Sequence, residues 1–204
     1  MPEPSRTSDP RPTPTTPLAG WIDAVAAPPP SPAGGAAAAI TASLAAALAE
    51  MVAALTHSKE RYAAGHERAR PVLDRAPQLR GELLHLAVRD AEAFQRFLSA
   101  RGEARTAALH EAARIQLDLL IGATAAADLA VTMADVGAPS ALGDAATGAF
   151  LAAAAARSAY WAMRSDLDPT SAESATMLSL GLELLEKVEA AEWRVRQILN
   201  ERIR

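Results

Sequence analysis

Long alanine-rich stretches, such as AAAAITASLAAALAEMVAAL at residues 36–55, are the feature that most constrains how this chain folds. Alanine has the highest intrinsic helix propensity, and beyond the first 32 residues no stretch alternates in the manner of a strand. Hydrophobic residues make up 50% of the chain, but aromatic residues only 4%. The sequence therefore predicts an all-α protein whose core is built by the close approach of small side chains.

Proline and glycine divide the chain into six expected helical regions. These are residues 18–26, a long helix following Gly35, and residues 67–100, 106–136, 140–166 and 170–203. The helix after Gly35 has one apolar face formed by Ile40, Leu44, Leu48, Met51 and Leu55. Pro71 and Pro77 predict a kink or an interruption in the third region. Thr170-x-x-Glu173 predicts a capping box at the start of the last one. Together the regions predict a bundle of long antiparallel helices joined by short loops.

Residues 1–17 are rich in proline, threonine and serine and have no apolar periodicity, which predicts a disordered tail before one helical domain at 18–204. The net charge of -4, with no basic cluster, argues against binding to nucleic acid. The apolar runs, such as residues 145–156, are expected to be too short and too weakly hydrophobic to span a membrane. Without a recognisable secretory signal, we expect a cytoplasmic protein.

Asp90 is the polar residue that most clearly violates the helical pattern. On a helical wheel it lies within the apolar stripe formed by Leu79, Leu83, Leu86, Phe94 and Phe97. A carboxylate in such a place needs a partner, because burial without one raises its pKa and is costly. An arginine, a helix end or a ligand would each serve. A structural role and a functional one are both open.

Asp144 begins the fifth helical region, above a face of small residues that includes Gly148 and Ala155. Such a face allows a helix or a flat ligand to approach the backbone. An acid in the first turn also complements the positive end of the helix dipole. From the residues alone, the dipole interpretation is favoured for Asp144.

Metal binding has little support in the sequence. Glu82-x-x-His85 has the spacing of one half of a di-metal site in a helical bundle, but that architecture uses the motif twice and the chain contains it once. His57, His66 and His110 have no spacing that suggests a zinc site, and the chain has no cysteine. We therefore expect no metal.

Gly34 and Gly35 precede the long alanine-rich helix, and Lys59 follows it. The two glycines could present backbone N–H groups to an anionic ligand, or simply permit the turn. Lys59 and Lys187 are the only lysines among 20 basic residues. An ammonium can give up its proton, whereas a guanidinium cannot, so Lys59 is a candidate functional group.

Several short motifs occur in the order and at the spacing of a known family. They are Pro30, Pro32, Gly34, Gly35, Glu50-Met51-Val52, Leu55-Thr56, Lys59 and Tyr62, followed by Asp90-Ala91-Glu92-Ala93-Phe94 and Asp144. Over residues 18–167 the chain resembles the cyclodeaminase/cyclohydrolase family, which includes formimidoyltetrahydrofolate cyclodeaminases and methenyltetrahydrofolate cyclohydrolases.

The resemblance implies an all-helical homodimer that binds a reduced folate, with a tetrahydrofolate derivative as substrate. Cyclodeaminases convert 5-formimidoyltetrahydrofolate into 5,10-methenyltetrahydrofolate and ammonia, and cyclohydrolases open the methenyl bridge with water. Carried over to this chain, the resemblance assigns catalytic roles to Asp144, Lys59 and Asp90. It assigns ligand binding to Gly34, Gly35, Glu50 and Tyr62.

The chain departs from the family pattern at Ala33, Ala36, Ala138, Gly143 and Ala162, where the family has glycine or polar residues. Ligand groups left without hydrogen bonds weaken binding, so either the substrate differs or catalysis is weakened. Two hypotheses follow: a folate enzyme, or a non-catalytic homologue that serves as a binding or interaction scaffold. The enzyme is favoured because the ionisable residues remain. The sequence leaves open whether the reaction is deamination or hydrolysis, and whether the site spans two subunits.

Overall fold

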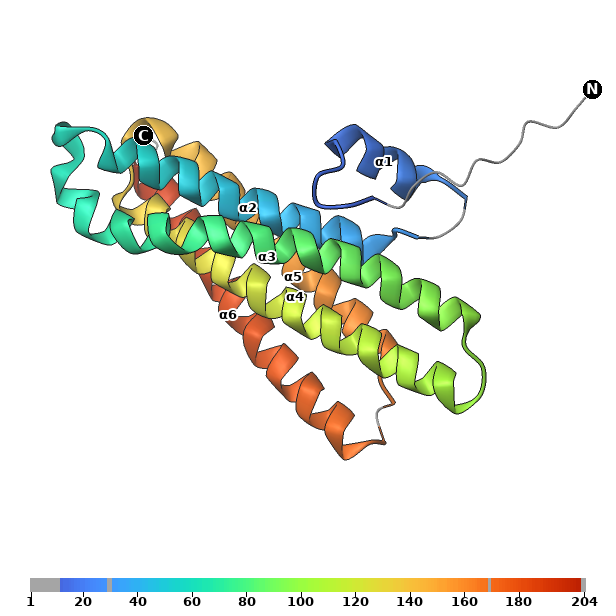
Figure 1. The fold of residues 1–204 in the computed structure, drawn as a ribbon. Helices are drawn as coiled ribbons and strands as arrows, with labels where there is room; N and C mark the ends of the chain where they lie inside the picture. The colour runs from blue at the N-terminus through green and yellow to red at the C-terminus, as the bar shows by residue number, and fades with distance from the viewer. Residues whose placement is uncertain (1–11, 29–30, 169, 203–204) are drawn as a thin grey trace, which may run out of the picture.

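The computed structural model of the chain describes residues 12–28, 31–168 and 170–202, and within these residues it contains helices and no strand (Figure 1). The elements are α1 (Leu18–Ala26), α2 (Gly34–His57), the 3-10 helix η1 (Glu60–Gly65), α3 (His66–Ser99), α4 (Glu103–Val136), the 3-10 helix η2 (Pro139–Ala141), α5 (Leu142–Asp166) and α6 (Ala172–Arg202). The all-α prediction is confirmed, and the bounds of α1 are those predicted.

The long helices α2, α3, α4, α5 and α6 form the bundle. Helices α2 and α3 pack side by side, as do α4 and α5, and α2 also packs against α5. Helix α6 lies against α4 and α5 on the far side from α3 (Figure 1). The short α1 lies over the N-terminal half of α2 and buries Trp21 there. The connections between the long helices lie at two opposite ends of the bundle (Figure 1).

The buried face of α2 is made mostly of alanine, not of the larger residues that the sequence pattern singled out. Leu44 and Met51 are 46% and 40% exposed, whereas Ala39, Ala46 and Ala53 are completely buried. Small side chains bring neighbouring backbones close together: a Cβ built at Gly148 of α5 would lie 3.2 Å from the carbonyl oxygen of Ala45. The predicted face exists, but much of it points away from the core.

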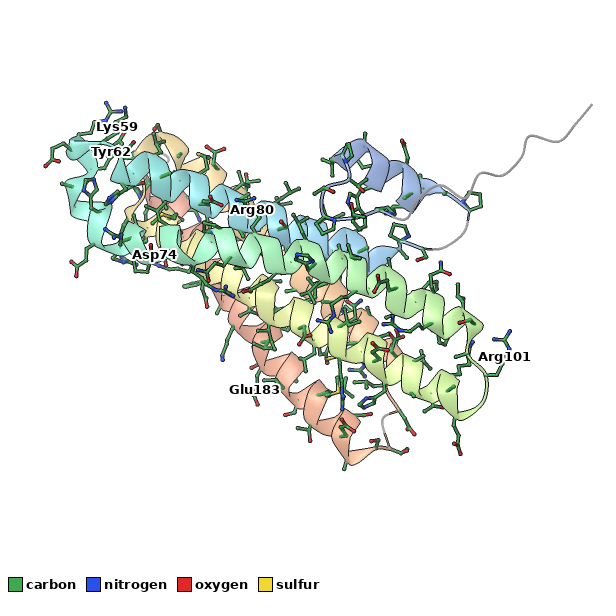
Figure 2. The ribbon with its side chains drawn as sticks, viewed as in Figure 1. Lys59, Tyr62, Asp74, Arg80, Arg101 and Glu183 are labelled. Carbon is green, nitrogen blue, oxygen red and sulfur yellow. The ribbon has the colours of Figure 1, made fainter. Side chains whose placement is uncertain are left out.

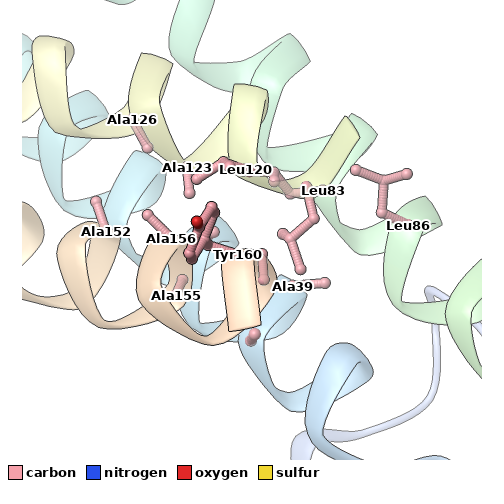
Figure 3. Packing of buried hydrophobic residues seen from close by; sticks show 14 of the residues in the cluster. Ala39, Leu83, Leu86, Leu120, Ala123, Ala126, Ala152, Ala155, Ala156 and Tyr160 are labelled. Atoms are coloured by element: carbon pink, nitrogen blue, oxygen red, sulfur yellow. The ribbon is translucent and has the colours of Figure 1, made fainter. Parts of the chain in front are cut away.

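The few large side chains fill the gaps that alanine leaves. Figure 3 shows the ring of Tyr160 enclosed by Ala123, Ala152 and Ala156 in the middle of the bundle. Gly181 brings α6 close to α5, because a Cβ there would lie 2.5 Å from Cε of Met163. This packing makes the core intolerant of added volume.

Two local predictions differ from the structure. Helix α3 is continuous through Pro71 and Pro77; both prolines are exposed, so the backbone around them can be solvated. Ser171 rather than Thr170 meets the first turn of α6, since the Ser174 N–H points to its Oγ at 3.5 Å. Glu173 instead forms an ion pair of 2.6 Å with Arg114.

Part of the predicted tail, residues 12–17, lies within the described residues. Residues 12–17 form a turn in which the Thr13 N–H donates to Oγ1 of Thr16, and the Trp21 indole N–H donates to the carbonyl of Thr13. Composition alone could not reveal these contacts with α1. The rest of the predicted tail, residues 1–11, lies outside the described residues.

Two helices, α2 and α4, are long and apolar enough by length and composition to cross a membrane, unlike the shorter runs considered from the sequence. In each case only about half of the most apolar stretch is buried inside the fold, 50% for α2 and 56% for α4. In both helices the remainder of that stretch is therefore not enclosed by the bundle.

Candidate functional site

The seven residues assigned from the resemblance lie in two groups at opposite ends of α2, with Glu50 between them. Gly34, Gly35 and Asp90 belong to the N-terminal end, while Lys59 and Tyr62 lie just beyond the C-terminal end (Figure 2). The 24 residues from Gly35 to Lys59 correspond to about 36 Å at a rise of 1.5 Å per residue. A single small-molecule site within one chain therefore does not bring both groups together.

The first group is built around the carboxyl group of Asp90. Gln116 of α4 is only 4% exposed, and its Nε2 donates to Oδ1 of Asp90 at 2.5 Å. Gly35 packs directly on this pair: a Cβ there would lie 2.2 Å from both Asp90 Oδ1 and Gln116 Nε2. The other amide atom of Gln116, Oε1, is buried and has no partner in the described structure. We call Gly35, Asp90 and Gln116 the Asp90 cluster.

The environment of the cluster changes the acidity of Asp90. Burial raises the pKa of Asp90 to about 6, and the negative charge of Asp166 at the end of α5 acts in the same direction. The Ala36 N–H in the first turn of α2 and the Gln116 amide partly oppose this rise. The sequence predicted an arginine, a helix end or a ligand as the partner of this carboxyl group. The structure supplies a helix end, the start of α2. Asp90 can therefore exchange a proton near neutral pH.

Gln116 was missed by sequence reasoning, although a signal was present. It is a polar residue that shares a helix face with Ala113 and Leu120, both buried. A second missed residue is Asp166, whose own pKa is raised by burial.

The second group lies at the other end of the bundle. Lys59 is exposed, and its carbonyl group bonds to Nε2 of His66 at 3.1 Å. Tyr62 in η1 is partly buried, with the guanidinium of Arg61 4.8 Å from its ring centroid. Asp144 is exposed in the first turn of α5, where it complements the helix dipole as predicted.

Thr56 links the end of α2 to the segment before α5. Its hydroxyl donates to the carbonyl of Val52 at 2.7 Å and accepts the N–H of Ala138 at 2.9 Å. Gly65 fits beside the same connection, because a Cβ there would lie 2.5 Å from the carbonyl oxygen of Val136. These contacts hold the end of α2, the 3-10 helix η1 and the segment before α5 in one arrangement, so Lys59 and Asp144 share one end of the bundle.

Replacing Thr56 with valine is expected to destabilise the protein. Thr56 is completely buried, so Thr56→Val keeps the shape but leaves the buried Ala138 N–H without an acceptor, at a cost of about 1–3 kcal/mol. Denaturant unfolding measures this change, with Thr132→Val, a partly buried site where the hydroxyl bonds only within its own helix, as the control. Equal stability of the two variants would contradict the bridging role.

The remaining assigned residue, Glu50, is charge-paired. Arg80 of α3 donates to its Oε2 at 3.1 Å, and the two side chains are partly buried. Among the positions that depart from the family pattern, Ala36 and Ala138 are buried, Ala33 and Ala162 are partly buried, and Gly143 is exposed. The first two therefore lie in packed surroundings and not on an open surface.

Glu82, considered above as half of a metal site, is held by Arg75 through hydrogen bonds of 2.7 and 2.9 Å. This contact lowers the pKa of Glu82. Across residues 12–28, 31–168 and 170–202, no three His, Asp or Glu side chains are placed to hold a metal ion together.

The bundle thus places a protonatable carboxyl group, that of Asp90 in α3, beside the start of α2. A family model described as formiminotransferase-cyclodeaminase matches residues 17–177. The crystal structure of formiminotetrahydrofolate cyclodeaminase from Thermotoga maritima superposes with a TM-score of 0.86 at 26% identity, covering 93% of this chain and 98% of that one. A sequence search of curated proteins finds no match. The chain belongs to the formiminotransferase-cyclodeaminase family.

Proposed function

We propose that the protein is a folate-dependent one-carbon enzyme of the formimidoyltetrahydrofolate cyclodeaminase or methenyltetrahydrofolate cyclohydrolase type. The observation that carries this proposal is Asp90, a largely buried carboxyl group with a pKa of about 6 in a cyclodeaminase fold. An acid–base group works best when its pKa lies near the working pH. Asp90 is the group in the cluster that meets this condition.

Both reactions need such a group. In deamination, N10 of the folate adds to the formimidoyl carbon, the tetrahedral centre then releases ammonia, and the leaving nitrogen must gain a proton. In hydrolysis, water adds to the methenyl carbon, loses a proton, and the bond from that carbon to N5 breaks. In this proposal Asp90 transfers the proton, and a carboxylate from the opposite end of a second subunit, Asp144 of the partner subunit, stabilises the cationic amidine-like group. Lys59 binds an anionic group of the folate or assists proton transfer.

The test is to mix the protein with 5,10-methenyltetrahydrofolate and follow the loss of its near-UV absorbance, and separately to measure ammonia released from 5-formimidoyltetrahydrofolate. Asp90→Asn, Asp144→Asn and Lys59→Met are each expected to lower turnover by roughly 100-fold or more. The matched control is Asp118→Asn, a carboxylate half-exposed on α4 that pairs with Arg89. If these three variants keep the wild-type rate, the assignment of roles is wrong.

The alternative function is a non-catalytic scaffold that binds folate or a protein. One observation favours it: Ala36, which occupies the family's serine position, is completely buried in the first turn of α2 beside Asp90 and brings no hydroxyl there. Failure of the wild-type protein to accelerate either reaction would select this alternative. Calorimetry with 5,10-methenyltetrahydrofolate then distinguishes a folate-binding scaffold from one that binds no folate.

The proposal includes a homodimer with reduced folate as its ligand. Helix α2 contains one charged residue, Glu50, and that residue is paired with Arg80. The exposed Leu44 and Met51 therefore lie on an uncharged helix surface. Sustained apolar surface of this kind marks an interface in soluble proteins.

A further inference from the structure

Gln116 places an amide group among buried apolar residues of α4. Its side chain is only 4% exposed, and it shares a helix face with Ala113 and Leu120. A buried amide normally forms hydrogen bonds with both of its polar atoms. Here Nε2 donates to Oδ1 of Asp90 at 2.5 Å, but Oε1 is enclosed and has no partner in the described structure. A half-paired amide lowers stability, so packing does not explain why this position holds glutamine.

The two oxygens of the Asp90 carboxyl group have different surroundings. Oδ1 accepts from Gln116 and lies against the backbone of Gly35, where a Cβ would come within 2.2 Å of it. In the described residues, the enclosed side-chain atoms without a hydrogen bond are Oε1 of Gln116 and Nε2 of His110. Oδ2 of Asp90 accepts from no side chain there and is not one of these enclosed atoms. A ligand can therefore reach Oδ2 but not Oδ1.

We propose that Gln116 is a positioning residue for proton transfer by Asp90: its amide group holds Oδ1, so that the proton is taken up and released at Oδ2. An O–H at Oδ1 would point its hydrogen at the N–H of Gln116 or at Gly35, so Oδ2 is the better site for the proton. In deamination the proton passes from Oδ2 to the leaving nitrogen, and in hydrolysis it passes from the attacking water to Oδ2. These two steps rest on the proposed function, whereas the effect of Gln116 on Asp90 does not.

The other groups that face Asp90 come from α2 and α5. The first turn of α2 supplies the N–H of Ala36 and no charged side chain. From α5, the like charge of Asp166 raises the pKa of Asp90, whereas the amide of Gln116 lowers it. Charged residues next to these positions on α3 and α4 are engaged in ion pairs, Arg89–Asp118 and Arg114–Glu173. Gln116 and Asp166 are therefore expected to act on Asp90 in opposite directions.

The first test is the pKa of Asp90, measured from its carboxyl carbon signal in an NMR titration, with Asp90→Asn to identify the signal. Gln116→Met keeps the length of the side chain and removes the donor. It is expected to raise the pKa of Asp90 by about one unit, because a hydrogen bond to the charged form is lost. Asp166→Asn is expected to lower this pKa. Thr124→Val is the matched control, since Thr124 is 6% exposed on the same helix and its hydroxyl bonds to the carbonyl of Leu120.

Turnover is a second measurement, and a merely structural role would not change it in the same way. With the folate that the wild type turns over, Gln116→Met is expected to lower kcat by roughly 10-fold and to leave KM within about twofold. The pH profile of kcat is expected to move upward together with the pKa of Asp90. In the Asp90→Asn background the same substitution should have no further effect, because the acid that it positions is absent.

Stability separates positioning from packing. At about pH 5, where the folded protein holds the Asp90 proton, Gln116→Met is expected to be at least as stable as the wild type, since it removes a half-paired amide. Gln116→Glu provides a second variant of nearly the same shape. It replaces the donor with another carboxyl group, so it should also raise the pKa of Asp90.

Two results would overturn the proposal. If both variants leave the pKa of Asp90 at the wild-type value, the amide group does not act on the carboxyl group. If the pKa shifts but kcat at the new optimum equals that of the wild type, proton transfer does not depend on Gln116. A wild-type protein that turns over neither folate, with the pKa shifts as expected, would reject the proposed function and keep the effect of Gln116 on Asp90.

Discussion

Gly35→Ala is expected to lower the free energy of unfolding by roughly 2–4 kcal/mol, while Gly34→Ala changes it by less than about 1 kcal/mol. The two glycines are adjacent in the first turn of α2, but only one is enclosed. A Cβ at Gly35 would overlap Asp90 and Gln116 at 2.2 Å, whereas a Cβ at Gly34 meets nothing within 4 Å. Gly35 is therefore required by packing and Gly34 is not.

Denaturant unfolding of the two variants and the wild type measures this difference. The alanine at position 35 must separate Asp90 from Gln116 or displace the start of α2, so the hydrogen bond of 2.5 Å between them is expected to be lost as well. Gly34→Ala is a close control because it adds the same methyl group one residue away. If both variants prove equally stable, the Asp90 cluster is not packed as described.

The glycine pair also shows how a motif can combine two roles. From the sequence, Gly34 and Gly35 could have bound an anion or only permitted a turn. The structure shows that neither has a positive φ, so no left-handed turn explains them. Gly35 instead gives room for a carboxyl group and an amide from two other helices. Such a tertiary contact cannot be read from the local sequence.

Much of the fold could be predicted from the positions of proline and glycine and from the spacing of apolar residues. Proline and glycine marked the helix ends, and the position of Asp90 in an apolar stripe correctly indicated a buried carboxyl group with a partner. The buried face of α2 was not the predicted one, because alanine packs inside while Leu44 and Met51 remain exposed. In an alanine-rich helix the larger residues identify one face, but the closest helix contacts are made by the smallest ones.

The arrangement of the site was only partly predictable. Motif order suggested one site, although the length of the helix between Gly35 and Lys59 already implied a separation of about 36 Å. Gln116 could have been noticed as a polar residue among buried ones, but its contact with Asp90 depends on how α3 and α4 pack. Helix packing sets these contacts, and it involves residues far apart in the chain.

Asp90→Asn is expected to stabilise the protein more at pH 7 than at pH 3.5. The quantity compared is the free energy of unfolding of the variant minus that of the wild type at the same pH. The folded state raises the pKa of Asp90 from 3.8 to about 6. Between these two values the folded protein holds the Asp90 proton more often than the unfolded chain does. The stability of the wild type therefore falls as the pH rises through this range, and it levels off above about pH 6.

The size of the effect follows from the two pKa values. Their difference, about 6 minus 3.8 or about 2.2, corresponds to up to about 3 kcal/mol, since each pKa unit is worth about 1.4 kcal/mol. Asparagine keeps the shape of the side chain and can still accept from Gln116, but it carries no charge to bury. Unfolding curves of both proteins from pH 3.5 to 7.5 give the difference in their free energies of unfolding. The titration of all other groups largely cancels in this difference.

Asp135 provides a control of opposite sign. Arg68 donates to its carboxylate at 2.5 Å and holds the pKa of Asp135 below its ordinary value, so Asp135→Asn should lower stability at neutral pH and matter less in acid. If Asp90→Asn behaved like Asp135→Asn, Asp90 would be an ordinary structural anion. If Asp90→Asn is instead more stable at pH 7 but has lost turnover, Asp90 lowers stability and is needed for function. This result is expected where function requires a protonatable carboxyl group in a buried place.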